Sequence, residues 1–200
     1  MSQIIDISVA ILAGGKSARF GSPKIYANFR GKSLIQCSIE TSFKVSNSVS
    51  IISGRNSPFG FNQVKSFQDL IPDKGPLGGI YTALKIAQTP WIAIMPCDMP
   101  FLRPEIYQNL YYTLMDQRPI AVVFQQQIEP LVSIWPKRVY HELKLYLDDH
   151  QFNVLKVLRK LNVQKYHITA EPLVFLNINT RKDYQISLQN PVTESHASRS

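Results

Sequence analysis

The sequence predicts an α/β fold built on a single doubly wound, mostly parallel sheet. Short apolar runs alternate along the 200-residue chain with longer segments of helical pattern. Several of these runs are nearly continuous, which is typical of strands in a sheet that is covered on both faces. The resulting order, β-α-β-β-α-β-α, indicates parallel strands joined by crossover helices.

The strands are expected at the apolar runs and the helices at the periodic segments between and after them. In chain order the predicted strands are Ser8–Leu12, Ser48–Ser53, a weaker one at Gln63–Phe67, Trp91–Met95, Ile120–Gln125, Leu131–Trp135 and Leu173–Ile178. The predicted helices are Ser33–Val45, Leu77–Ala87, Pro104–Asp116, Val139–Leu147, Asn153–Leu161 and Arg181–Leu188. Pro104 suits a first helical turn, and the Arg118-Pro119 pair marks the end of the helix that begins there.

Composition indicates a globular chain, with 44% hydrophobic and 18% charged residues. We therefore expect one domain over residues 1–189 and a disordered polar tail at 190–200. The sequence has no apolar stretch of membrane-spanning length and no signal-peptide pattern at its N-terminus, so a cytoplasmic protein without a membrane partner is expected. The two cysteines, Cys37 and Cys97, fall in different predicted elements, which indicates reduced thiols.

The net charge of +8 is unevenly distributed. Residues 1–65 hold eight Lys and Arg residues against two acids, Asp6 and Glu40. Such an excess raises the local concentration of polyanions. Nucleic acid is not expected as a partner, because the cations are scattered and no nucleic-acid-binding module is present. A polyphosphate substrate explains the placement better.

The first predicted strand ends in a loop suited to a triphosphate. Gly14 and Gly15 allow backbone N–H groups to approach phosphate oxygens, while Arg19 and Lys24 neutralise charge. The loop matches neither the P-loop nor the dinucleotide-binding fingerprint. Taken alone, the glycine pair favours a turn followed by a solvated basic loop, but the cations and the segments further along the chain favour phosphate binding.

Asp98 directly follows a long apolar strand, where ligands bind in open α/β sheets. Magnesium prefers oxygen ligands and commonly uses one or two carboxylates together with substrate phosphates and water. The sequence therefore predicts that Asp98 holds Mg²⁺. A role as a helix cap fits poorly, because Pro100, Phe101 and Leu102 all lie between Asp98 and the helix that begins near Pro104.

Two further strand ends carry polar side chains. Asp69 follows the weaker predicted strand, where its carboxylate can accept hydrogen bonds from a ligand, although Asp69 could also be a turn acid before Pro72. Asn177 and Asn179 alternate in the sequence, so in a strand their side chains share one face and can orient phosphate or help to hold the metal. The same segment is also a turn signal, with Thr180 placed to cap the last helix.

Four segments, taken in order, resemble the molybdenum cofactor guanylyltransferases, a family of nucleotidyltransferases. They are Leu12–Lys24 with the pattern Leu-Ala-Gly-Gly-x-x-x-Arg-x-Gly-x-x-Lys, Asp69 with Gly75–Ile80, Pro96–Leu102, and Asn177–Thr180. The similarity extends over nearly the whole chain, from about Ile7 to Tyr184. It implies a Rossmann-like nucleotidyltransferase fold with a small antiparallel extension.

The resemblance also implies a reaction and roles for residues. The terminal phosphate of the molybdenum–molybdopterin cofactor would attack the α-phosphorus of GTP, with Mg²⁺ as cofactor and with molybdoenzymes or their chaperones receiving the product. Lys24, Arg19 and Asp98 would be catalytic, and Asn177 and Asn179 would support the substrate or the metal. The implied nucleotide-binding residues are Leu12, Ala13, Gly14, Gly15, Lys24, Ser53, Asp69 and Asp98.

The chain departs from the family pattern just before the phosphate-binding lysine. Ser22 and Pro23 stand where relatives commonly carry a glycine and an acid, and Pro23 lacks a backbone N–H. Within the same class, a cytidylyltransferase for the same pterin or a sugar-phosphate nucleotidyltransferase is the alternative. A nucleotide-binding regulator without turnover is the alternative from another class.

Overall fold

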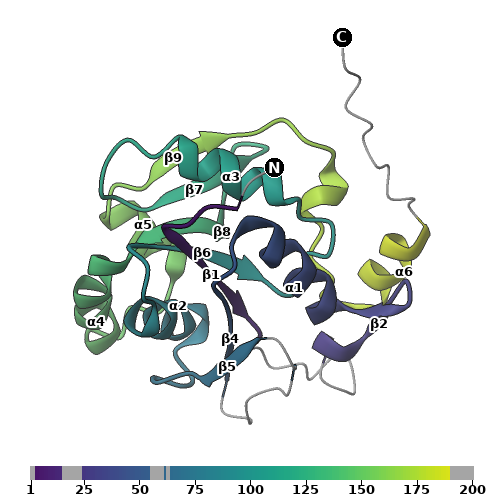
Figure 1. Cartoon of the computed structure of the whole chain (residues 1–200), viewed down its shortest axis with the longest axis horizontal. Coiled ribbons are helices and arrows are strands. Elements are labelled where there is room, and N and C mark those ends of the chain that lie inside the picture. The colour runs from purple at the N-terminus through teal and green to yellow at the C-terminus, as the bar shows by residue number, and fades with distance from the viewer. Residues whose placement is uncertain (1–2, 15–23, 55–60, 62–63, 190–200) are drawn as a thin grey trace.

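The computed structural model describes residues 3–14, 24–54, 61 and 64–189, with the backbone alone at Lys24 and Arg181. Its main strands are β1 (Ile7–Leu12), β4 (Val49–Ser53), β5 (Lys65–Gln68), β6 (Trp91–Pro96), β7 (Ile120–Phe124), β8 (Gln127–Pro136) and β9 (Gln164–His167). They form one sheet in the order β5-β4-β1-β6-β8-β7-β9 (Figure 1). Neighbouring strands are parallel except around β8, which is antiparallel to both β6 and β7. The predicted α/β fold with a mostly parallel sheet is confirmed.

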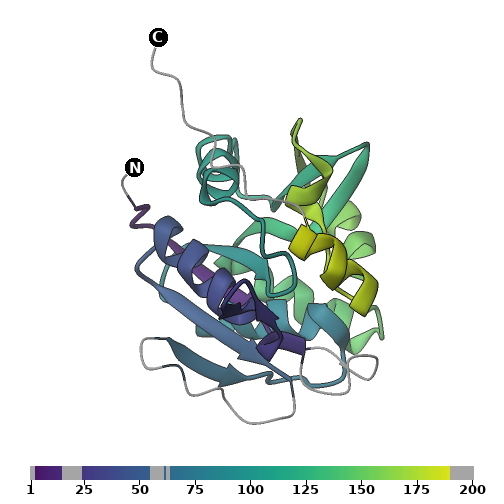
Figure 2. The same cartoon turned by 90° about the vertical axis from the view of Figure 1, so that its right-hand side faces the viewer.

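Helices cover both faces of this sheet (Figures 1 and 2). On one face lie α1 (Leu34–Val45), α3 (Pro104–Tyr112) and the 3-10 helix η3 (Pro172–Phe175). On the other lie α2 (Gly75–Ile86), α4 (Tyr140–Asp148), which the 3-10 helix η2 (Lys137–Val139) precedes, and α5 (Val154–Lys160). The buried residues of β1 alternate between the two resulting cores, as successive side chains of a strand must. This alternation explains why the strand sequence is apolar throughout.

A small antiparallel hairpin follows the short 3-10 helix η1 (Lys24–Tyr26). Its strands are β2 (Asn28–Phe29) and β3 (Lys32–Ser33), and Arg30 and Gly31 between them have φ angles of 54° and 85°. Two positive φ values are characteristic of a type I′ turn, which glycine at the second position favours. The predicted antiparallel extension is thereby confirmed. The hairpin lies beside the C-terminal helix α6 (Arg181–Gln189), drawn in yellow in Figures 1 and 2.

Three features of the structure differ from the sequence prediction. The segment Leu173–Ile178 does not form a strand: Pro172 begins the 3-10 helix η3, and Val174 and Phe175 are buried in the core on the α1 side. Conversely, β9 was not predicted, because it is a polar edge strand in which Gln164 is the buried residue. The helix that begins at Pro104 also ends at Tyr112 rather than Asp116.

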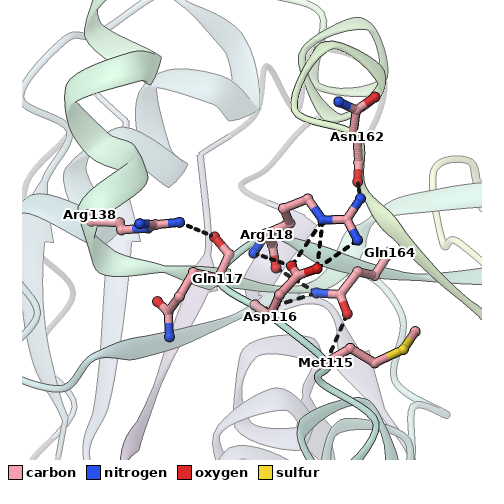
Figure 3. A network of polar contacts seen from close by, with 7 residues as sticks. All are labelled: Met115, Asp116, Gln117, Arg118, Arg138, Asn162 and Gln164. Carbon is pink, nitrogen blue, oxygen red and sulfur yellow. Dashed lines mark hydrogen bonds and ion pairs between the residues drawn. The ribbon is translucent and has the colours of Figure 1, made fainter.

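The buried amide of Gln164 holds the edge of the sheet that is formed by the amino ends of β7 and β9 (Figure 3). Its Oε1 atom accepts from the backbone N–H of Met115 at 2.9 Å, and its Nε2 atom donates to the carbonyls of Asp116 and Arg118 at 3.3 and 2.9 Å. Arg118 in turn pairs with the Asp116 carboxylate and donates to the carbonyl of Asn162. One side chain thus satisfies three backbone groups of the loop that leads into β7.

No helix among the residues that the structure places is long and apolar enough to cross a membrane. Cys37 and Cys97 are both free thiols, as predicted.

Candidate active site

The carboxyl ends of three strands meet at one edge of the sheet. Leu12, the last residue of β1, pairs with Ile52 of β4 on one side and with Pro96 of β6 on the other. After β1 the chain builds outward through β4 and β5 and then returns to add β6 on the opposite side of β1. The strand order therefore reverses between β1 and β6, and ligands bind at this position in open α/β sheets.

The loop after β1 leaves the sheet in close contact with the loop after β4. The Ala13 N–H donates to the Ile52 carbonyl at 2.9 Å, which continues the parallel ladder beyond β1. A Cβ atom at Gly14 would lie only 3.1 Å from the backbone nitrogen of Gly54. Glycine at residue 14 therefore lets the two loops approach each other and leaves the exposed backbone accessible to a ligand.

Leu12 and Ala13, where the chain leaves β1, pack into the core. Both are buried, and a Cβ atom at Gly79 in the first turn of α2 would lie 3.2 Å from Leu12 Cδ2. Any contact of these two residues with a nucleotide would therefore use the backbone. Gly15 and Arg19 lie outside the described residues, and of Lys24 only the backbone, at the start of η1, is described.

Asp98 stands just beyond the carboxyl end of β6, as predicted, and is half-buried. Buried Met99 and Leu102 follow it, and the Leu102 N–H donates to the Met99 carbonyl at 3.2 Å to form a tight turn. The Asp98 carbonyl accepts from the Ile178 N–H at 2.9 Å. This hydrogen bond brings the Asn177–Asn179 segment to the end of β6.

Ile178 anchors that segment, although not as part of a strand. Its side chain is fully buried, in a cluster with Phe29 and Leu34, while Asn177 and Asn179 flank it nearer the surface. The argument that both amides share one face of a strand is wrong, because no strand forms in this part of the described chain.

The predicted cap of the last helix is present. The Asp183 N–H donates to Thr180 Oγ1 at 3.2 Å, while Asp183 Oδ2 accepts from the N–H groups of Asn179 and Thr180 at 2.9 and 2.7 Å. Reciprocal bonds of this kind form a capping box and fix the start of a helix. The cap therefore also fixes the segment that lies against Asp98.

Asp69 stands at the same edge, directly after β5. Its N–H donates to the Ser53 carbonyl at 2.8 Å, and its Oδ1 atom accepts from the Ile71 N–H at 3.0 Å and from Thr82 Oγ1 at 2.8 Å. Burial raises the pKa of the Asp69 carboxyl, although the two hydrogen bonds to Oδ1 act in the opposite direction.

Ser53 is buried, and its hydroxyl donates to the Phe67 carbonyl at 3.2 Å. That bond links β4 to β5, so the structure gives this hydroxyl a partner within the sheet. Its predicted role in base contact stays a prediction.

The oxygen donors at Asp98 fit a magnesium ion. The carboxylate of Asp98 and the amides of Asn177 and Asn179 belong to segments that one backbone hydrogen bond holds together. Nowhere in the described ranges do three His, Cys, Asp or Glu side chains cluster as a metal site. Magnesium does not require such a cluster, because phosphates and water complete its shell when it binds with a nucleotide.

The sequence did not reveal the residues that hold Asp69. Thr82 lies inside an apolar helix, and only the packing of α2 against the loop after β5 brings its hydroxyl to the carboxylate. Gly78 belongs to a segment that the sequence singled out, but its contact with Asp69 depends on the same packing.

A mostly parallel α/β sheet with exposed Gly14 after β1 and carboxylates after β5 and β6 agrees with a nucleotidyltransferase, and the comparisons with known proteins show that class. The chain matches the MobA-like NTP transferase domain over residues 9–165. A protein of Geobacillus sp. (strain WCH70) named "Probable molybdenum cofactor guanylyltransferase" is 32% identical over 87% of this chain and 94% of its own. The "Molybdenum cofactor guanylyltransferase" of Photobacterium profundum is 29% identical over 89% of this chain and 93% of its own.

Solved structures agree on the fold. The crystal structure of molybdopterin-guanine dinucleotide biosynthesis protein A from Archaeoglobus fulgidus superposes with a TM-score of 0.74, at 24% identity, over 90% of this chain and 96% of its own. The chain belongs to the MobA-like NTP transferase family, and the predicted resemblance to the molybdenum cofactor guanylyltransferases is confirmed.

Proposed function

We propose that this enzyme transfers GMP from GTP to the molybdenum–molybdopterin cofactor, forming a guanine dinucleotide cofactor and pyrophosphate. The names of its relatives support the acceptor and the nucleotide. The observation that carries the proposal is the position of two carboxylates, Asp69 and Asp98, at the strand edge on either side of the glycine loop after β1.

In this reaction a terminal phosphate oxygen of the cofactor attacks the α-phosphorus of GTP. A new P–O bond forms as the bond between the α-phosphorus and its bridging oxygen breaks, and the bond's electron pair leaves with pyrophosphate. Because the substrate supplies the attacking oxygen, no protein nucleophile is needed. Catalysis then consists of positioning the two substrates and stabilising charge on the phosphates.

Different residues would bind the metal ion, neutralise the triphosphate and contact the nucleotide through the backbone. Asp98, with Asn177 and Asn179 beside it, would hold Mg²⁺, which when bound neutralises charge on the phosphates. Lys24 and Arg19 would add positive charge along the triphosphate. The backbone at Gly14 would lie against the nucleotide.

Asp69 would select guanine. Its carboxylate is an acceptor, and guanine presents the N1–H and N2–H₂ donors on one edge, whereas adenine N1 and cytosine N3 are acceptors that a carboxylate repels. Pairing of partly buried polar groups rejects mismatched ligands strongly, because the mismatch leaves such groups without a partner. The Leu12-Ala13-Gly14-Gly15 form of the loop also favours the guanylyl reaction, since cytidylyl relatives tend to have a second alanine there.

Pyrophosphate release by purified protein with Mg²⁺ and the molybdenum–pterin cofactor tests the proposal. Release with GTP in clear preference to CTP, ATP and UTP supports it. Equal or faster release with CTP would assign a cytidylyltransferase, and turnover only with a sugar phosphate would assign the sugar-nucleotide reaction. Nucleotide binding without pyrophosphate release in the presence of any acceptor would leave a regulator and overturn the proposal.

A further inference from the structure

We propose that Thr82 is a positioning residue for nucleotide selection, because its buried hydroxyl holds one oxygen of the Asp69 carboxylate and so fixes the orientation of the whole group. This inference rests on the proposed role of Asp69 in recognising the base. Thr82 touches neither substrate nor metal in it and acts only through Asp69.

Both hydrogen-bond partners of the Thr82 hydroxyl belong to the loop after β5. Thr82 is 0% exposed on the inner face of α2. Its Oγ1 atom donates to Asp69 Oδ1 at 2.8 Å and accepts from the Leu70 N–H at 2.9 Å. A hydroxyl has one donor to give, so the carboxylate oxygen receives the only proton that Thr82 can supply.

The two oxygens of Asp69 therefore have different surroundings. Oδ1 accepts from both Thr82 and the Ile71 N–H, whereas no group in the described residues donates to Oδ2. Oδ2 instead lies against the first turn of α2, where a Cβ atom at Gly78 would be only 2.8 Å away. A side chain at residue 78 would collide with Oδ2, so glycine at this position allows α2 to pack this closely against the carboxylate.

The arrangement fixes the torsion of the Asp69 side chain. Two donors on Oδ1 come from different elements, the loop itself and α2. Rotation of the carboxylate would break both bonds and leave the buried hydroxyl of Thr82 without its acceptor. An acceptor held in one orientation before the base arrives discriminates better than a mobile one, since less ordering accompanies binding.

Thr82 also influences the charge of Asp69. Burial and the nearby Asp73 raise the pKa of this carboxyl, and the bonds from Ile71 and Thr82 lower it. Among the described residues, Lys74 at the start of α2 and Lys85 near its end lie over the rings of Phe152 and Tyr81. Loss of the Thr82 hydroxyl therefore raises the pKa of Asp69 further. The carboxylate then gains a proton, and loses its preference for guanine donors, at a higher pH than in the wild type.

The experiment compares GTP and ATP binding across pH in the wild type and in Thr82→Val, which keeps the side-chain shape but lacks the hydroxyl. Thr82→Val is expected to lower the preference for GTP by about tenfold, which corresponds to one hydrogen bond to a charged group. It is also expected to move the acid-side fall of GTP affinity to higher pH. Thr82→Ser restores the hydroxyl and should restore both properties.

Ser46→Ala is the matched control. The Ser46 hydroxyl is also buried, donates to the Ile7 carbonyl at 2.6 Å and accepts from the Ser48 N–H at 3.0 Å, but at the amino end of β1. Its loss should lower thermal stability and leave GTP preference and the pH profile unchanged.

The outcomes separate the two proposals. A wild type without GTP preference overturns both the guanylyl assignment and this inference. A wild type that prefers GTP, together with a Thr82→Val variant of unchanged preference and pH profile, overturns the role of Thr82 alone. If Thr82→Val does not fold, Thr82→Ala is measured in the same way and judged by the same results.

Discussion

Arg30 joins three segments that lead to the candidate active site, so its removal should affect turnover without direct contact with substrate. Its guanidinium donates to the Ser187 carbonyl of α6 at 3.0 Å. The same group lies 5.2 Å from the ring centre of Phe29 and 5.5 Å from that of Phe101. Phe101 follows Asp98 in the loop after β6, and α6 follows the Asn177–Asn179 segment.

The magnitude follows from these contacts. Of these contacts, only the hydrogen bond from the charged guanidinium to Ser187 holds α6 directly, and at an exposed side chain it contributes about 1.4 kcal/mol. Because about 1.4 kcal/mol is a factor of ten, Arg30→Ala should raise the open fraction of α6 roughly tenfold. Tyr184 still donates its hydroxyl to the Asn28 carbonyl, so the helix should loosen rather than detach.

Native-state hydrogen exchange of α6 and steady-state kinetics measure the two consequences. We expect faster exchange in α6, a lower kcat and a nearly unchanged KM for GTP, because Asp69, the residue proposed to contact the base, lies on the far side of β1. Arg118→Ala is the control: Arg118 is also exposed and donates to a distant carbonyl, that of Asn162, but at the opposite edge of the sheet. Faster exchange in α6 with wild-type kcat would refute the link between this helix and the site.

Three further predictions concern the site and its scaffold. Asp98→Asn should fold normally and bind GTP but lose most turnover, with partial recovery at high Mg²⁺ or Mn²⁺; near-normal activity at low Mg²⁺ in a metal titration would remove Asp98 from the mechanism. Lys24→Ala and Arg19→Ala should weaken nucleotide binding while thermal stability stays near that of the wild type, which titration calorimetry and a melting curve together check. Gln164→Leu should lower the free energy of unfolding by about 2 kcal/mol, because three backbone groups beside an exposed loop lose their buried hydrogen-bond partner. The Tm should then fall by roughly 4–8 °C. A changed GTP affinity per folded molecule would contradict the placement of Gln164 at the opposite edge of the sheet.

The position of Asp98 at the end of a strand could be predicted from the sequence, because the apolar run of β6 and the charged residue beyond it are both easy to recognise. The run that forms β6 is apolar on both faces, so its end is easy to locate. A charged residue just beyond such an end lies at the ligand-binding edge of an open α/β sheet. The sequence thus gives both the location and the chemistry of this residue.

The segment before α6 shows where the same argument fails. Leu173–Ile178 is as apolar as the true strands, but its residues are buried between other elements rather than in a sheet. Pro172 starts a 3-10 turn, and Ile178 uses its N–H on the Asp98 carbonyl. Hydrophobicity reports burial, and it does not distinguish a strand from an irregular segment packed against a core. The sequence therefore predicted that Asn177 and Asn179 lie at this edge of the sheet, but it did not predict the backbone conformation of their segment.

Separate contacts hold the two parts of the site that we propose for base selection and for metal binding. Asp69 is held by Thr82 of α2 and by the backbone of its own loop. The segment beside Asp98 is held by one backbone bond, by the cap of α6 and, through Arg30, by the small hairpin. The two sets lie on opposite sides of β1. Changes at Thr82 should therefore alter which nucleotide binds, and changes at Arg30 should alter how fast a bound nucleotide reacts. The two kinds of variant should combine additively in the free energy of the transition state, as independent sites do.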